Sequence, residues 1–136
     1  MPVDDDFLSP SAAIGGAMTA ALLEEQRAAL TKWGAGALLA RHPEVAPYKH
    51  VKGLLTCEGD LDFHVRHLHA ALEHHADLRS YAPWVTNVLA QRQMTAEQVR
   101  LGVAVLVEAL YRFLPHPHGE AAAAPLIAAF GPTTSP

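Results

Sequence analysis

The stretch DLDFHVRHLHAALEHH, residues 60–75, decides the fold, because its apolar residues recur at helical spacing. A helical wheel of about 100° per residue places four apolar side chains on one side: Leu61, Val65, Leu68 and Leu72. Asp62, Glu73 and Arg66 lie on the opposite side. The sequence therefore predicts a central amphipathic helix that begins near Asp60, as its N-cap, and runs to about His75.

Five of the nine histidines of the chain lie in this stretch: His64, His67, His69, His74 and His75. The wheel sends all of them except His69 toward the apolar side. An imidazole in an apolar core is costly unless it finds a hydrogen bond, a metal or a cofactor. The inward histidines are thus candidate functional residues. The alternative is that they are structural histidines, bonded to carbonyls and carboxylates.

His64 lies at the centre of the apolar side and is the candidate metal ligand. His67 follows it at i, i+3 and could meet the same ion, whereas His75 is three turns away, about 16 Å along the helix. Tyr81 and Trp84 are expected on the neighbouring helix, either as core anchors or as walls of a flat cofactor held by His64. Haem or another tetrapyrrole is the simplest such cofactor, which makes all five residues candidate cofactor contacts.

A non-haem di-iron bundle is a further alternative, because His69 and Glu73 form an HxxxE pair. The pair falls on the polar edge of the wheel, which counts against it. Cys57 is the only cysteine and lies beside Glu58, which would not lower the pKa of its thiol. No nucleophile is plainly coupled to a base, so we expect the chain not to be an enzyme.

The composition limits the class of protein. The chain has 136 residues, of which 50% are hydrophobic and 7% aromatic, with a net charge of −4. This balance favours packed helices over a sheet and argues against nucleic-acid binding. The N-terminus carries three aspartates where a secretory signal needs positive charge, and the apolar stretch 12–23 is too short to cross a bilayer. A cytoplasmic protein that does not enter membranes is expected.

The expected organisation is a flexible acidic leader over 1–10, a single helical domain over 11–130 and a polar tail over 131–136. The fold class is all-α, a bundle of five to six helices, with a globin-like arrangement as one option. Gly34 and Gly36 are expected to interrupt the first helix. A capping box at Thr95 opens the clearest helix, which Pro115 ends. Its apolar residues follow the spacing of one buried face: Val99, Val103, Leu106, Val107, Leu110 and Leu114. The expected helical segments are 12–32, a piece before Pro43, a short helix near Tyr48, 60–75, 77–93, 95–114 and 120–130.

Short motifs between residues 57 and 115 occur in an order that resembles a known helical domain: Cys57, Asp60, His64-Val-Arg-His67-Leu68, Ala71-Leu72, Tyr81, Trp84, Arg92, Leu110 and Leu114-Pro115. The domain is found in bacterial regulatory proteins, beside or within cobalamin-binding proteins. The resemblance implies an all-helical sensory or regulatory module and singles out His64. The sequence departs from the pattern at His67, where the pattern has tyrosine, and at Pro83. The DxHxxG loop typical of base-off cobalamin binding is absent.

These observations predict a small cytoplasmic ligand-binding sensor or regulatory module, in which a buried histidine anchors a tetrapyrrole. A module of this size would act through a separate output protein, and its alanine-rich helices offer flat faces for a homodimer. The alternative is a cofactor-free module for dimerisation or protein interaction.

Overall fold

The computed structural model describes residues 10–131, and all statements on structure refer to this part of the chain. It contains five α-helices and one short 3-10 helix: α2 (Pro10–Arg41), η1 (Ala46–Tyr48), α3 (Gly53–His74), α4 (Tyr81–Ala90), α5 (Ala96–Phe113) and α6 (His118–Phe130). The described residues form no strand, so the predicted all-α bundle is confirmed. The predicted leader, apart from Pro10, and the predicted tail beyond Gly131 lie outside the described residues.

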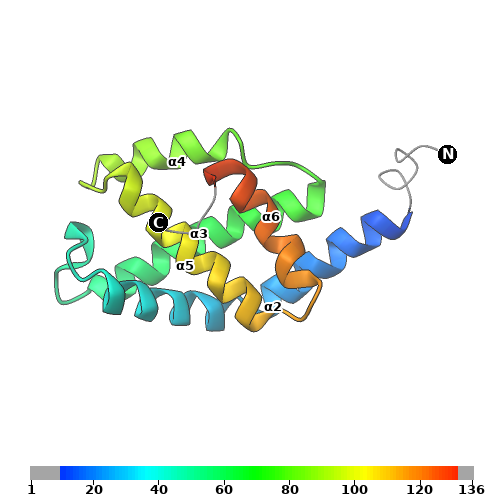
Figure 1. Ribbon diagram of the computed structural model, residues 1–136, viewed down its shortest axis with the longest axis horizontal. Helices are drawn as coiled ribbons and strands as arrows, with labels where there is room; N and C mark the ends of the chain where they lie inside the picture. Colours follow the sequence, from blue (N-terminus) through cyan, green and yellow to red (C-terminus); the bar gives the residue numbers. More distant parts are fainter. Residues whose placement is uncertain (1–9, 132–136) are drawn as a thin grey trace.

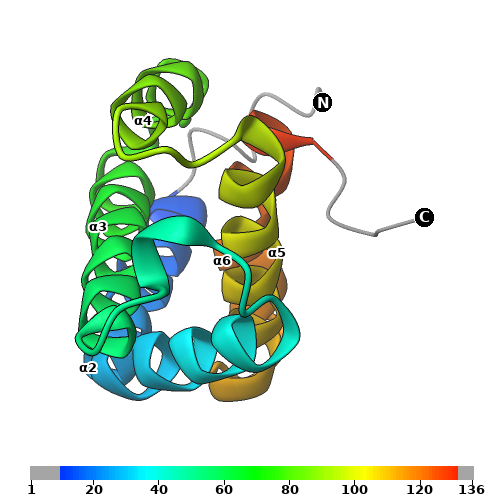
Figure 2. The same cartoon turned by 90° about the vertical axis from the view of Figure 1, so that its left-hand side faces the viewer.

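Helix α2 packs along α3 and α5, and α5 packs along α6 (Figure 1). Figure 2, viewed along the bundle, shows α3 and α5 on opposite sides, with α4 at the end away from α2. The largest side chains of the core are leucines that are at most 1% exposed: Leu23, Leu30, Leu38, Leu61, Leu68, Leu106, Leu110 and Leu126. No helix among the described residues is long and apolar enough to cross a bilayer.

The predicted break at Gly34 and Gly36 is wrong, because α2 continues to Arg41. Gly34 lies against α3, where an added Cβ would come within 3.0 Å of Cδ1 of Leu61. A glycine inside a helix costs about 1 kcal/mol relative to alanine. Here the close approach of α2 to α3 offsets that cost, which the pattern of a single helix cannot reveal.

The predicted N-cap at Asp60 is also wrong, because α3 begins at Gly53. A Cβ at Gly53 would lie 1.9 Å from the carbonyl oxygen of Tyr48, so only glycine fits between η1 and α3. Asp60 instead lies inside α3, with its side chain available for tertiary contacts. The predicted end of the helix is confirmed: α3 ends at His74, and His75 caps it in the left-handed conformation with φ of 52°.

The remaining helices follow the sequence more closely. Helix α4 is shorter than the predicted 77–93, because the side chain of Asp77 instead accepts a hydrogen bond from the backbone N–H of Arg79 (3.0 Å) in a turn before it. The capping box of α5 is confirmed, with both hydrogen bonds between Thr95 and Gln98 at 3.0 Å. The predicted apolar face of α5 is buried: Val99, Val103, Leu106, Val107, Leu110 and Leu114.

Candidate functional site between helices α3 and α4

His64 is the buried histidine of the bundle, with 3% of its surface exposed. Its Nδ1 lies 2.6 Å from the hydroxyl of Tyr81, the first residue of α4. The ring of Phe130 from α6 approaches it edge-on, with the centroids 6.3 Å apart. Burial lowers the pKa of His64 to about 4, with a smaller opposing effect from Asp60. His64 is therefore neutral at physiological pH, as expected for an inward imidazole.

His67 lies one turn further along α3 and joins an aromatic cluster. Its ring stacks on Tyr81 at 4.4 Å and contacts Phe63 at 4.5 Å between centroids. Nδ1 of His67 donates a hydrogen bond to the carbonyl oxygen of Phe63 (3.0 Å), because a carbonyl can only accept. Trp84 completes the cluster, with its ring 5.9 Å from Phe63. The cluster arises because Phe63 and His67 are spaced i, i+4 on α3, facing Tyr81 and Trp84 at i, i+3 on α4.

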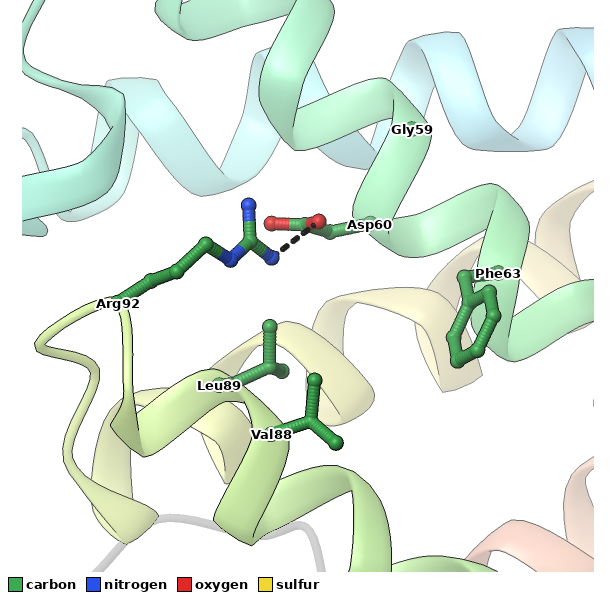
Figure 3. Close-up of a pocket in the computed structure, with 6 residues that line it drawn as sticks. All are labelled: Gly59, Asp60, Phe63, Val88, Leu89 and Arg92. Atoms are coloured by element: carbon green, nitrogen blue, oxygen red, sulfur yellow. Dashed lines mark hydrogen bonds and ion pairs between the residues drawn. The ribbon is translucent and has the colours of Figure 1, made fainter.

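Beside this cluster is a cavity of about 240 Å³ between α3 and α4, shown in Figure 3. We call it the α3–α4 groove; its lining residues are Gly59, Asp60, Phe63, Val88, Leu89 and Arg92. Phe63 from α3 and Val88 from α4 project into the same space, while the polar pair Asp60–Arg92 lies at one end (Figure 3). Trp84 is 50% exposed, so one of the two tryptophans of the chain lies at the surface next to this cavity.

Asp60 joins three parts of the chain at the polar end of the groove. The hydroxyl of Tyr48 donates a hydrogen bond to Oδ2 of Asp60, and Nη2 of Arg92 donates one to Oδ1, both at 2.6 Å. Burial, followed by this hydrogen bond, raises the pKa of the Tyr48 hydroxyl far above its ordinary value. Asp60 therefore ties the segment before α3 and the turn after α4 to the middle of α3.

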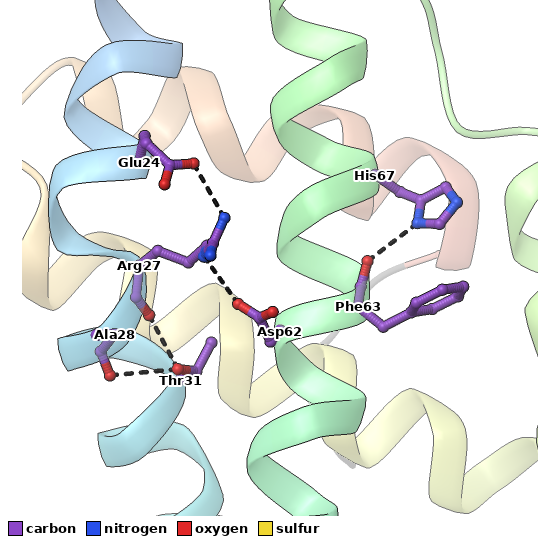
Figure 4. Close-up of polar contacts among 7 residues, drawn as sticks. All are labelled: Glu24, Arg27, Ala28, Thr31, Asp62, Phe63 and His67. Carbon is purple, nitrogen blue, oxygen red and sulfur yellow. Dashed lines mark hydrogen bonds and ion pairs between the residues drawn. The ribbon is translucent and has the colours of Figure 1, made fainter.

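The opposite side of α3 faces α2 and carries a separate polar contact, shown in Figure 4. Nε of Arg27 lies 2.9 Å from Asp62, and Nη1 of Arg27 lies 3.1 Å from Glu24. Asp62 and Phe63 project from opposite sides of α3 (Figure 4). Asp62 therefore joins α3 to α2, away from the groove.

Four of the five predicted cofactor contacts lie in or beside the aromatic cluster: His64, His67, Tyr81 and Trp84. The fifth, His75, lies away from it. His75 is exposed, and an added Cβ at Gly16 would lie 3.1 Å from its Cε1, so its ring lies next to α2. The predicted inward position of His75 is wrong because the helix ends at His74 and the wheel does not apply beyond that residue. His74, which was also predicted to face inward, is exposed as well.

The histidines do not form a metal centre as a group. Nδ1 of His64 bonds to Tyr81, whereas Nδ1 of His67 bonds to a backbone carbonyl. His69 lies 3.5 Å from Glu73, as the HxxxE spacing predicts, on the outside of the bundle. Among the described residues no three His, Cys, Asp or Glu side chains converge in a way that could hold a metal ion.

A haem bound through His64 does not fit the arrangement of these residues. The imidazole is covered by Tyr81 and Phe130, and one ring nitrogen is already engaged by Tyr81. The groove does not include His64, and its volume is below the roughly 300–1,000 Å³ of a typical site for drug-sized ligands. Because His64 is only 3% exposed, iron could reach its second ring nitrogen only if the rings of Tyr81 and Phe130 packed around it moved apart.

Three residues of the site were not predicted from the sequence to be functional: Phe63, Asp60 and Phe130. Phe63 precedes His64 and shares a side of the wheel with His67, so the wheel contained a signal for it. Asp60 was expected to be an N-cap, and nothing local indicates its partners Tyr48 and Arg92. Phe130 reaches His64 only through the tertiary packing of α6.

A scan against models of known protein families and searches of curated proteins and of solved structures found no match to this chain. The resemblance to a regulatory domain and the globin-like arrangement therefore stay predictions.

Proposed function

We propose that this chain is a small regulatory module that binds a flat, largely apolar ligand in the α3–α4 groove. The observation that carries the proposal is the half-exposed Trp84 beside a cavity whose apolar walls are Phe63, Val88 and Leu89. A single exposed aromatic side chain is ordinary, but Trp84 and Val88 are exposed together at i, i+4 on α4, and tryptophan is enriched at binding interfaces. A flat ring gains both apolar burial and stacking at such a surface.

A tetrapyrrole remains the ligand class that we propose, because the sequence resembles a domain associated with cobalamin proteins. The geometry favours a particular mode for it. One edge of the macrocycle enters the cavity, and a face of the ring lies on Trp84, whose ring is 5.9 Å from that of Phe63 at the cavity wall. In this mode the ligand is held by stacking and apolar contact, and His64 acts as a buried support for Tyr81.

Two porphyrins distinguish stacking from iron coordination: protoporphyrin IX, which contains no metal, and hemin. We expect both to bind with similar affinity in an absorption titration of the full chain. His64→Ala should bind both porphyrins with affinities within a few-fold of those of the parent chain, provided that circular dichroism shows a folded variant. Phe63→Ser, at the wall of the cavity, would weaken both by 10-fold or more, and the exposed Tyr111→Ser would serve as its control.

If hemin binds and protoporphyrin IX does not, and if His64→Ala abolishes the binding of hemin, the result would contradict stacking and favour coordination of the iron by His64. Failure of both porphyrins to bind would exclude the tetrapyrrole proposal.

A second candidate function is protein interaction without a cofactor, in which a partner side chain fills the cavity. The size of the cavity favours it, since about 240 Å³ suits one large side chain better than a whole macrocycle. Trp84 and Val88 are exposed at i, i+4 on α4, the spacing of helix-mediated docking. Here we expect a homodimer in light scattering that Trp84→Ser converts to a monomer, and a monomeric parent chain would exclude the homodimer.

A further inference from the structure

A second exposed surface lies at the N-terminal end of α3, where α2 leads into it through η1. We call residues 49–55 the tip; its exposed side chains are Lys49, His50, Val51, Lys52, Leu54 and Leu55. In Figure 1 the tip is coloured cyan to teal and lies at one end of the long axis of the molecule, and Figure 2 views the molecule from this end. None of the residues that line the α3–α4 groove belongs to it.

The tip exposes apolar side chains to an unusual degree. Val51 is 99% exposed, Leu55 67% and Leu54 45%. A single exposed aliphatic residue is ordinary for a protein surface, but three within five consecutive positions form a patch. Among the described residues the other large apolar side chains that are exposed to a comparable degree lie elsewhere in the sequence: Met18, Trp84, Val88 and Tyr111.

The backbone holds this patch in place. Tyr48, which precedes it, is buried and donates its hydroxyl hydrogen bond to Asp60. Gly53, which follows Lys52, packs against the carbonyl of Tyr48, and its N–H donates to the carbonyl oxygen of His50 (2.8 Å). The backbone N–H of Lys52 donates to Nδ1 of His50 (3.2 Å). Val51 is therefore presented by a hydrogen-bonded turn whose two ends are anchored in the core.

The charged side chains of the tip itself are both basic, and Glu58 lies one helical turn beyond Leu54. Lys49 and Lys52 flank Val51 and are two of the three lysines in the chain, which has a net charge of −4. Residues 45–57 contain no aspartate or glutamate, and Glu44 and Glu58 are the nearest acidic residues along the chain. The tip is thus locally cationic in a protein that is acidic as a whole.

We propose that the tip docks reversibly on a lipid surface that carries anionic headgroups. Lysines beside exposed aliphatic residues suit the boundary between headgroups and acyl chains, where the ammonium groups meet phosphates and the aliphatic side chains enter the apolar layer. Protein interfaces, in contrast, are depleted of lysine and enriched in aromatic residues and arginine. The tip has no aromatic side chain at its surface and projects from an end of the molecule (Figure 1), as docking on a flat surface requires.

This inference departs from the expectation that the protein avoids membranes. It does not depend on the proposed ligand site, because the tip and the groove are distinct surfaces. The predicted attachment is peripheral and weak, since three aliphatic side chains and two lysines provide far less than an inserted helix.

Co-sedimentation of the full chain with vesicles tests the proposal, using phosphatidylcholine alone and phosphatidylcholine mixed with phosphatidylserine. We expect binding only to the mixed vesicles, and its loss at high salt because the charges are screened. Lys49→Gln with Lys52→Gln should weaken binding about 30-fold, since each lysine near an anionic surface contributes about a factor of five. Val51→Ser with Leu55→Ser should also weaken it.

The matched control is Trp84→Ser with Val88→Ser, which removes exposed apolar side chains away from the tip and should bind mixed vesicles like the parent chain. Circular dichroism verifies that each variant is folded. Equal binding to both kinds of vesicle, absence of binding, or tip variants that bind normally would overturn the proposal. Self-association of the parent chain that the tip variants abolish, without vesicle binding, would assign the tip to a protein contact instead.

Discussion

The hydroxyl of Tyr81 and Nδ1 of His64 lie 2.6 Å apart and join the start of α4 to the middle of α3. This hydrogen bond satisfies the buried imidazole without a metal or a cofactor. The same Tyr81 also stacks on His67, so it contacts both histidines of this part of α3. The buried histidine thus supports the groove rather than lining it.

Tyr81→Phe tests this role directly. The variant keeps the ring but leaves a buried imidazole nitrogen without its partner, which costs about 1–3 kcal/mol of unfolding free energy. Urea unfolding followed by circular dichroism measures the loss. The exposed Tyr111→Phe is the matched control and should change stability by less than about 0.5 kcal/mol. Equal effects in the two variants would mean that the His64–Tyr81 contact contributes nothing to folding.

The buried state of His64 makes stability depend on pH. Its pKa is lowered to about 4 in the folded protein, from 6.5 when unfolded. Between these values the unfolded chain binds the additional proton, so stability is greatest above 6.5 and falls as the pH drops toward 4, by up to about 1.4 kcal/mol per pH unit. The charged or titratable groups that act on His64 are Tyr81, His67 and Asp60.

His64→Gln provides the comparison for this pH dependence, since it removes the buried imidazole and leaves the rest of the sequence unchanged. We expect the difference in stability between the parent chain and His64→Gln to shift in favour of the variant as the pH falls from 7 to 4.5. A difference that stays constant over this range would show that His64 is not buried in its neutral form.

Asp60 should matter more to stability than the neighbouring acidic residue. Asp60→Ala removes the hydrogen bonds of Tyr48 and Arg92, and a hydrogen bond to a charged group contributes about 1.5–3 kcal/mol. Asp62→Ala removes only a surface ion pair with Arg27, which contributes about 0–1 kcal/mol. Thermal unfolding of both variants decides the order, and a larger loss for Asp62→Ala would contradict the role of Asp60.

Two glycines of the sequence should respond in opposite directions. Gly53→Ala would bring a Cβ within 1.9 Å of the Tyr48 carbonyl oxygen, so the turn before α3 must shift and stability should fall. Gly36 has nothing within 4 Å of an added Cβ, so Gly36→Ala should raise stability by about 0.5–1 kcal/mol through helix propensity. A stabilising Gly53→Ala would contradict the packing of η1 against α3.

The sequence predicted the all-α class and the apolar face of α5 correctly, because both depend on local periodicity. It also predicted the buried position of His64 and the proximity of Tyr81 and Trp84. It did not predict the effects of tertiary contacts or of a helix end. Gly34 remains helical because α3 packs against it, and His75 does not face the core because the helix ends before it. The partners of Asp60 come from segments 12 and 32 residues away, which no local pattern connects.

A flat ligand bound in the α3–α4 groove should change the indole N–H signals of the two tryptophans differently. Trp84 lies beside the groove, whereas Trp33 packs under Arg112, with the guanidinium carbon 5.0 Å from its ring centroid. Protoporphyrin IX added to the 15N-labelled chain should shift the NMR signal of Trp84 through the ring current of the porphyrin, and the shift should saturate. The signal of Trp33 should stay in place. The spectrum of Trp33→Phe identifies which signal belongs to which tryptophan. Saturable porphyrin binding with an unmoved Trp84 signal, or with the larger shift at Trp33, would contradict the account.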